Sequence, residues 1–290
     1  MKKLITLILA LVMIMTLVAC GNNTTEPTKG TEAPTQAPTQ APTEGPTAPT
    51  QPPADMCACG CGTPKDQVVW KTVQQWLDET GALTATSIHA YFRQNFHVKM
   101  EADFDVTATF GVRKRVLLGQ SSKNITANLT LDLNGYTWSS DERFNVEPGC
   151  IFTLMDTSAA QTGKMISGGA EDLPGRVIAS SGTVNILSGT IAMKTENPAY
   201  VVKGGCIYIS KGELNIFGGV IENGSVNSDG LGGCIYLNDG DFNMYGGIIR
   251  GGQAAQGYNV WMESSVESNL QGGEIVADPA DPNNSVYFNG

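Results

Sequence analysis

Apolar residues recur from residue 131 onward in three columns, and the steps between repeats in the third column are 25 to 30 residues. Within a repeat, apolar and polar positions alternate, so that Ile207 and Ile209 fall on one side of a strand and Tyr208 on the other. Alternation with period two is typical of β-strands, and steps of variable length are typical of a solenoid whose turns change while its strands do not. The first column is Val177, Ile207, Ile235, Val260 and Val286; the second is Leu131, Phe152, Val184, Leu214 and Phe242; the third is Trp138, Ile166, Ile191, Ile221, Ile249 and Ile275.

Glycine pairs or Asn-Gly follow the strands, as in "FGG", "YGG" and "LNG". Glycine adopts backbone angles that β-branched residues cannot, so these pairs predict sharp bends. Three short strands and three bends make one coil of a parallel β-helix. Coils stacked about 4.8 Å apart bury the apolar side that a single coil leaves exposed, which explains the repetition.

The motifs "LTLDLNGYTW" (129–138) and "GGCIYLNDGDFNMYGGIIRGG" (232–252) resemble the glycine-rich right-handed parallel β-helix repeats of secreted gut-bacterial surface proteins, within the pectin-lyase-like fold superfamily. The resemblance covers about residues 129–290. It implies an all-β fold, a single right-handed parallel β-helix, and it implies no particular reaction, because one fold carries many activities. The "NTDG" or Asp-Asp pattern of polygalacturonases and the "RxPR" pattern of pectate lyases are absent.

The N-terminus has a different pattern. Residues 1–20, "MKKLITLILALVMIMTLVAC", combine two lysines, an uncharged and mostly apolar run of sixteen residues and a final cysteine, the layout of a secretory signal. The ending "LVAC" resembles the bacterial lipobox, in which the cysteine, here Cys20, is acylated after cleavage. An uncleaved transmembrane anchor is the alternative, although the apolar run is short for a span. In both cases the rest of the chain is expected at the extracellular face of the cytoplasmic membrane, on the cell surface.

Residues 21–55 are rich in Thr and Pro and have almost no side chains that form a core, so they predict a disordered tether. Residues 56–97 are expected to form a cap or lead-in segment, and residues 98–290 the β-helix domain. Within the cap, Val69, Val73, Trp76 and Leu77 fall on one helical face. A helix there would cover the unpaired backbone groups and apolar side chains at the open end of the first coil.

Composition narrows the chemistry. The chain of 290 residues has a net charge of −10 and two histidines, His89 and His97. Neither a Ser-His-Asp triad nor a metal site built on histidines is therefore expected, and the acidic charge argues against nucleic acid or an anionic membrane surface as a partner. An acidic polysaccharide would need a bridging cation such as Ca²⁺, and no other cofactor is expected.

Cysteines occur in two arrangements. Cys57, Cys59 and Cys61 form a C-x-C-x-C pattern, tighter than the C-x2-C of zinc ribbons. Local thiols or a local disulfide are the favoured interpretation, and a metal site is the alternative. Cys206 and Cys234 hold equivalent positions in consecutive coils, where a disulfide is geometrically feasible and buried free thiols are favoured.

Aromatic residues recur at two outward-facing places in the coil. Rings spaced along a rigid surface are what the C–H faces of a saccharide pack on. Equally, such rings stabilise adjacent strands or are covered by loops. The candidate ligand-binding residues are Tyr208, Tyr236, Trp261 and Tyr287 in one set, and Phe217 and Tyr245 in the other.

Two polar columns accompany the rings. Asn185, Asn215, Asn243 and Asn269 predict amide-to-amide hydrogen bonds along the stack. Glu213, Asp241 and Glu267 form an acidic column, and neighbours in it would lie near the roughly 5 Å that separates the carboxyls of a retaining glycosidase. Ca²⁺ binding and simple solvation are the other interpretations of these weak catalytic candidates, and solvation is the commonest fate of exposed acids.

Together these patterns predict a cell-surface lipoprotein whose β-helix serves adhesion or the binding of glycans or a host surface, without evident catalytic machinery. A polysaccharide lyase or glycoside hydrolase of the pectin-lyase-like fold is the alternative. A structural surface spacer is the second alternative.

Overall fold

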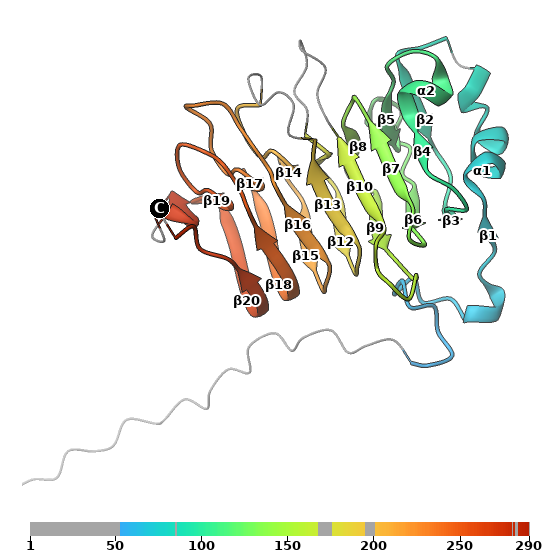
Figure 1. Cartoon of the computed structure of the whole chain (residues 1–290). Coiled ribbons are helices and arrows are strands. Elements are labelled where there is room, and N and C mark those ends of the chain that lie inside the picture. Colours follow the sequence, from blue (N-terminus) through green and yellow to red (C-terminus); the bar gives the residue numbers. More distant parts are fainter. Residues whose placement is uncertain are drawn as a thin grey trace, which may run out of the picture. The chain divides into compact units, whose positions relative to one another are not determined.

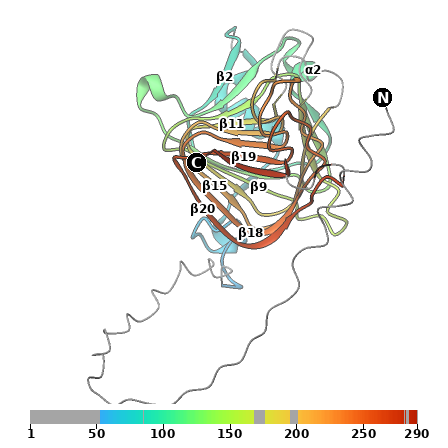
Figure 2. The ribbon, with the colours of Figure 1, turned by 90° about the vertical axis from the view of Figure 1, so that its left-hand side faces the viewer.

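The computed structural model describes residues 53–84, 86–167, 176–194, 201–279, 281 and 284–289, all within one compact unit, Ala48–Gly290. Strands of successive repeats pair in parallel and form a β-helix of about seven turns (Figure 1). Seen along the axis, the strands wind around a common interior (Figure 2). The expected all-β parallel β-helix is therefore confirmed. Among the described residues, no helix is long and apolar enough to cross a membrane.

The first wall of the β-helix is an eight-stranded parallel sheet in which neighbouring strands come from consecutive coils. Its strands are β2 (His89–Phe92), β5 (Arg115–Leu118), β8 (Phe144–Val146), β11 (Ile178–Ser180), β14 (Ile207–Ile209), β17 (Ile235–Leu237), β19 (Val260–Glu263) and β21 (Val286–Asn289).

The second and third walls join in a 13-stranded sheet, because β18 (Gly240–Arg250) runs through both and pairs with β20 (Val266–Ile275). Each repeat thus contributes three strand segments, as predicted. The second wall also holds β1 (Trp70–Lys71), β3 (Phe96–Lys99), β6 (Asn128–Asp132), β9 (Ile151–Met155), β12 (Thr183–Ile186) and β15 (Glu213–Ile216). The third wall also holds β4 (Phe104–Asp105), β7 (Thr137–Ser140), β10 (Lys164–Ser167), β13 (Thr190–Met193) and β16 (Val220–Glu222).

The inward ladder of the first wall is confirmed from β14 onward. Ile207, Ile235, Val260 and Val286 are consecutive register partners. The first three side chains are fully buried, and Val286 packs against the same core.

Three members of the predicted columns are displaced from the register. Each lies beside, or two positions from, another apolar residue, and turns of variable length leave the pattern unable to choose between them. Ile178 rather than Val177 pairs with Ile207, Leu129 rather than Leu131 pairs with Phe152, and Met165 rather than Ile166 pairs with Trp138 and Ile191.

Stacked glycines line the bend between the first and second walls. Gly212 and Gly240 have φ of 109° and 100°, a left-handed conformation that side chains rarely adopt. A Cβ at Gly240 would lie 1.9 Å from the carbonyl oxygen of Gly212 in the preceding coil. Consecutive coils can therefore approach to the β-sheet spacing at this bend only without a side chain.

Helix α1 (Val73–Thr80) forms in the predicted cap. The Thr72 hydroxyl accepts a hydrogen bond from the Gln75 N–H, and the Gln75 side chain accepts one from the Thr72 N–H. This capping box satisfies two backbone donors at the start of the helix. Gly81, in the left-handed conformation, ends it.

The buried face of α1 covers the first coil. Trp76 and Leu77 are buried, and the Trp76 ring stacks on Phe92 of β2 with 3.9 Å between centroids. Val73 packs against the same core. Val69 does not belong to this face, because it precedes the helix and is 72% exposed.

Short helices occupy several turns. The Asp105 side chain caps the helix that begins at Val106 by accepting a hydrogen bond from the Ala108 N–H at 2.7 Å. These elements are α2 (Val106–Phe110) and the 3-10 helices η1 (Lys65–Gln67), η2 (Ala82–Thr84) and η3 (Ser121–Lys123).

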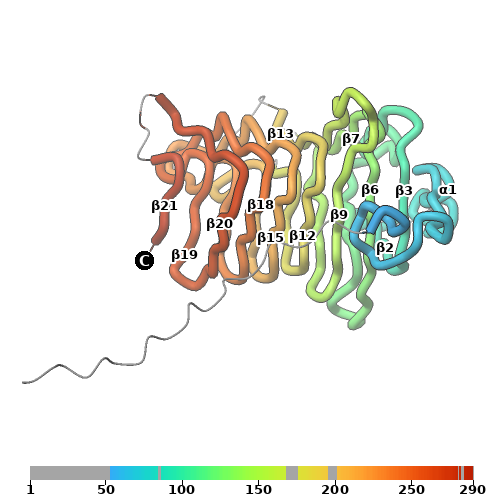
Figure 3. The backbone as a smooth tube through the Cα atoms, turned by 90° about the horizontal axis from the view of Figure 1, so that it is seen from below, coloured from blue at the N-terminus to red at the C-terminus, as the bar shows by residue number. Residues whose placement is uncertain are grey.

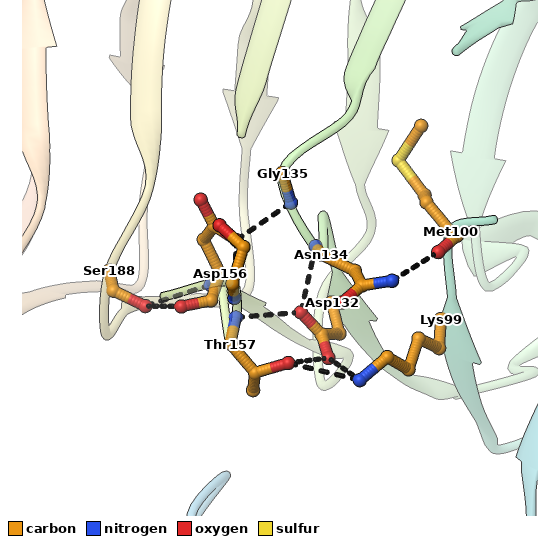
Figure 4. A network of polar contacts seen from close by, with 9 residues as sticks. Lys99, Met100, Asp132, Asn134, Gly135, Asp156, Thr157 and Ser188 are labelled. Atoms are coloured by element: carbon orange, nitrogen blue, oxygen red, sulfur yellow. Dashed lines mark hydrogen bonds and ion pairs between the residues drawn. The ribbon is translucent and has the colours of Figure 1, made fainter. Parts of the chain in front are cut away.

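Two buried aspartates hold the bends after β6 and β9 (Figure 4). Asp132 accepts hydrogen bonds from the backbone N–H groups of Asn134 and Thr157, both at 2.9 Å. Its other carboxylate oxygen lies 3.3 Å from Lys99 Nζ. The bend of one coil is thus tied to the coils on either side of it.

Asp156 holds the next bend. It accepts hydrogen bonds from the backbone N–H groups of Gly135 at 2.9 Å, Ser158 at 3.0 Å and Gly163 at 2.6 Å. Burial by itself would raise the pKa of Asp156, but these hydrogen bonds outweigh burial and hold that pKa below its ordinary value. The carboxylate is therefore the form that the fold stabilises.

Residues 53–68, here called the strap, lie across the outer side of the second wall near β6 and β9 (Figure 3). Cys57 and Cys59 of the strap are buried and pack with Met155 of β9 and with Leu187, which follows β12. The strap thus covers apolar side chains that point away from the coil interior.

Candidate functional site

The outer face of β15, β18 and β20 carries three short columns of similar residues. Because side chains alternate along a strand, Leu214 and Ile216 fill the core while their neighbours point outward. Register partners repeat this arrangement in the following coils. We call this face the outer patch; it consists of Glu213, Asn215, Phe217, Asp241, Asn243, Tyr245, Glu267 and Asn269. Strand spacing and pleat make it a flat array of about 10 by 13 Å.

The acids of the outer patch are consecutive register partners, Glu213 with Asp241 and Asp241 with Glu267. Asp241 and Glu267 are exposed, whereas Glu213 is half-buried and accepts a hydrogen bond from the Asn243 amide at 3.2 Å. The backbone positions of these acids therefore lie about one strand spacing, or about 4.8 Å, apart.

The asparagine column forms the predicted hydrogen-bond ladder over three coils. The amide of Asn243 donates to the side-chain oxygen of Asn215, and the amide of Asn215 donates to that of Asn185, each at 2.9 Å. The amide of Asn185 donates to the Thr153 hydroxyl at 3.3 Å. Asn269 is the register partner of Asn243. The ladder keeps the middle column of the outer patch rigid.

The aromatic column of the outer patch consists of Phe217 and Tyr245. Their rings stack with 5.3 Å between centroids and an interplanar angle of 13°, and both side chains are half-buried. Neither ring belongs to the core cluster that fills the coil. The pair therefore presents aromatic surface beside carboxylates and amides.

The other aromatic set lies on the outer side of the first wall, in register. Tyr208 stacks on Tyr236 at 5.6 Å, and Trp261 stacks on Tyr287 at 4.2 Å. Tyr208 is half-buried and Tyr287 is 36% exposed, but Tyr236 is fully buried and Trp261 is 5% exposed. For Tyr236 and Trp261 the structure therefore supports the alternative of covered rings over that of a bare binding face.

Charged side chains cover these rings. Lys203 Nζ lies 4.2 Å from the centroid of the Tyr236 ring and donates a hydrogen bond to its hydroxyl. Glu263 accepts hydrogen bonds from the Tyr236 hydroxyl and, at 3.2 Å, from the Trp261 indole N–H. Arg176 lies 4.7 Å from the centroid of the Tyr208 ring. Sequence reasoning missed these residues. Glu263 shares the outward face of β19 with Trp261, two positions away, whereas Arg176 and Lys203 lie outside the strands and come to the rings only through the stacking of coils.

The pKa shifts of these side chains agree with groups that hydrogen-bond to one another and are shielded from solvent. Burial raises the pKa of Tyr236, and the hydrogen bond to Glu263 raises it further. Burial alone would raise the pKa of Glu263, but its hydrogen bonds, first that from Tyr236, hold it below its ordinary value. Burial, followed by the neighbouring Arg143, lowers the pKa of Arg176 to about 10. We interpret the stacked rings of the first wall, with the charged side chains that cover them, as a brace between coils, because their polar groups hydrogen-bond to one another.

The three cysteines of the strap lie together with a histidine. Cys57 Sγ is 2.7 Å from Cys59 Sγ, and Cys59 Sγ is 3.5 Å from His97 Nε2. Cys61 completes the group, in which all four ligand atoms lie within 4.8 Å of one another. Burial raises the pKa of Cys59 and lowers that of His97. The sequence pointed to the cysteines, but no spacing could show that β3 places His97 beside them.

Cys206 and Cys234 are free and fully buried, so the favoured interpretation of these positions is confirmed. Each thiol donates to a backbone carbonyl, that of Glu222 and that of Arg250 respectively, at 3.3 Å.

A crevice elsewhere in the described part of the chain is lined by Val116, Trp138 and Met165, among others. None of the outer-patch acids Glu213, Asp241 and Glu267 lines it. Cys20, the predicted lipidation site, lies outside the described residues. No protein family, curated protein or solved structure matches this chain. Function is therefore inferred from the fold and from the outer patch.

Proposed function

We propose that this chain is a lipid-anchored cell-surface protein of the pectin-lyase-like superfamily whose β-helix binds glycans through the outer patch. The observation that carries the proposal is the half-buried stacked pair Phe217 and Tyr245, held beside open carboxylates on a rigid sheet. The other aromatic set is less suited, because its members Tyr236 and Trp261 are covered by charged side chains.

The chemistry of the outer patch suits a saccharide. Aromatic surface packs against the C–H face of a sugar ring, while carboxylate and amide oxygens accept hydrogen bonds from its hydroxyl groups. The rigid backbone supplies these contacts without ordering a loop, so little conformational entropy is lost on binding. Because the patch is acidic, a neutral glycan is the favoured ligand, and an acidic one would need Ca²⁺ as a bridge.

Glycan binding is tested on an array of neutral and acidic glycans with the purified protein, followed by titration of the best ligand. Tyr245→Ala and Phe217→Ala should each weaken binding about tenfold or more, as expected for an aromatic residue at the centre of an interface. Tyr91→Ala is the control, since Tyr91 is a half-buried tyrosine on β2, far along the stack. Equal loss in all three variants, or no glycan bound by the wild type, would refute the proposal.

The register of Glu213 and Asp241 favours a second candidate, a glycoside hydrolase or polysaccharide lyase, because two acidic residues occupy neighbouring strands about 4.8 Å apart on the same face. Glu213→Gln with Asp241→Asn should abolish release of reducing ends or unsaturated sugars if the protein is an enzyme. A binding protein releases no such products either as the wild type or as this variant. If neither the aromatic nor the amide variants change binding or turnover, the chain is a structural spacer.

The membrane anchor is tested separately through Cys20→Ala. Acyl chains supply membrane affinity that an acidic domain lacks, so this variant should appear in the soluble fraction or the medium. Unchanged membrane fractionation would instead indicate an uncleaved N-terminal helix.

A further inference from the structure

The strap holds its three cysteines in a closed loop. The Cys57 N–H donates to the Thr63 carbonyl at 2.8 Å, and the Gly60 N–H donates to the Cys57 carbonyl at 3.1 Å. Gly60 and Gly62 have φ of 71° and 73°, so the chain turns sharply between the cysteines. In an extended strand the alternate side chains of C-x-C-x-C would share one face in a row; the two turns gather them around a point instead.

His97 comes to this point from a different element. It lies in β3, on the outer side of the second wall, and its Nε2 faces Cys59 Sγ at 3.5 Å. The Trp70 ring meets the imidazole edge-on, with 5.4 Å between centroids, and Trp70 is the register partner of His97. Three sulfur atoms from a loop and one ring nitrogen from a strand therefore come together at one point.

The four donors match the coordination of one small soft cation. Zinc in a structural site takes four ligands as a tetrahedron, and Cys3His is one of its established ligand sets. With Zn–S of about 2.3 Å, the sulfurs of such a tetrahedron lie about 3.8 Å apart. The ligand atoms here lie within 4.8 Å of one another, and the two closest, Cys57 Sγ and Cys59 Sγ at 2.7 Å, would separate by about 1.1 Å to reach that geometry.

We propose that Cys57, Cys59, Cys61 and His97 bind one Zn²⁺ ion, which fastens the strap to the outer side of the β-helix. Binding replaces the thiol protons by the metal and releases them to solvent. The bond between the loop and β3 joins segments 38 residues apart, counted from Cys59 to His97. Closure of that loop holds the strap over Met155 and Leu187, whose apolar side chains it covers.

A local disulfide is the competing arrangement of the same residues. A bond between Cys57 and Cys59 would leave Cys61 and His97 without a role, whereas zinc uses all four groups. Cys61 is exposed, so an ion reaches the cluster from solvent without opening the fold.

The proposal is tested on the full chain, reduced, treated with a chelator and then titrated with Zn²⁺ alone or Co²⁺ alone. We expect one Zn²⁺ per chain by elemental analysis, and the intense visible absorption of tetrahedral, thiolate-bound Co²⁺. Loss of a residue that only hydrogen-bonds to a metal ligand reduces metal affinity roughly 10- to 100-fold. His97→Ala removes a proposed ligand itself, so it should reduce Zn²⁺ affinity by more than that. The controls are His89→Ala, which removes the other histidine, and Cys206→Ser, which removes a buried thiol elsewhere.

Alkylation of native protein gives a readout that does not depend on the variants folding. Zn²⁺ should protect Cys61, the exposed member of the cluster, from iodoacetamide. Failure of the reduced wild type to bind Zn²⁺, equal binding by the Cys57→Ser, Cys59→Ser, Cys61→Ser triple variant, or a Cys57–Cys59 disulfide in freshly isolated protein without metal would each overturn the proposal.

Discussion

The outer side of the second wall is built in two ways along the same β-helix. In the early coils its edge column holds Met155 and Leu187, which lie under the strap together with Cys57 and Cys59. In the later coils the same column continues as Phe217 and Tyr245. These two rings do not belong to the apolar cluster that the strap covers. The covered part is apolar and lies beside the cysteines of the strap, and the other part is bordered by acids and amides. One backbone register thus supports both an internal contact and a candidate binding face, and only the side chains and the cover differ.

The end cap gives the largest expected effect on the early coils. Trp76→Ala removes a fully buried ring that stacks on Phe92, and should destabilise the protein by about 3–5 kcal/mol in urea unfolding. Val69→Ala is the control, because Val69 is 72% exposed, and should change stability by less than about 0.5 kcal/mol. A similar cost for both variants would mean that α1 does not seal the first coil.

The stacking that both regions share depends on the glycine bend. Gly240→Ala places a Cβ against the Gly212 carbonyl at φ of 100°, and should cost about 3 kcal/mol or more. Gly111→Ala is the matched control, with φ of 67° and no atom within 4 Å of the added Cβ. It should cost only the conformational penalty, about 1–2 kcal/mol. Thermal melts of both variants measure the difference, and equal shifts would rule out the coil contact as its cause.

The covered and open parts are compared directly by truncating one side chain of each. Met155→Ala should cost about 2–3 kcal/mol, because Met155 is buried under the strap. Tyr245→Ala should cost about 1 kcal/mol or less, since its half-buried ring loses mainly one stacking contact. Denaturant midpoints check this order, and a larger loss for Tyr245→Ala would show that the outer patch is part of the packing.

A pH dependence is expected at the bend that Asp156 holds. The folded-state pKa of Asp156 lies below its unfolded value of about 3.9, so the carboxylate stabilises the fold above that pH. This contribution is lost as pH falls through the lower, folded-state pKa. Asp156→Asn should therefore cost about 1–2 kcal/mol at pH 7 and progressively less in acid. Asp229→Asn, at an exposed turn, is the control, and parallel pH curves for the wild type and Asp156→Asn would contradict the prediction.

The strand pattern and the glycine bends were readable from the sequence because they follow from local physics. A strand with period two states which side chains share a face, and a glycine between strands states where the chain can bend sharply. Repetition then places Ile207 over Ile235 and Asn215 over Asn243, because identical coils stack in only one way that keeps the apolar face buried. The three displaced register positions arise where turn length varies and an apolar neighbour offers an equal fit.

Only the tertiary structure decided which outward-facing side chains are covered by other segments of the chain. Nothing near Tyr236 indicates that Lys203 and Glu263 bury its ring, since they lie on other segments and meet it through the stacking of coils. In the same way, Cys59 and His97 become neighbours because the strap folds back over β3. Local pattern determines which side of a strand a residue takes, and long-range packing determines what lies on top of it, because that depends on the paths of segments distant along the chain.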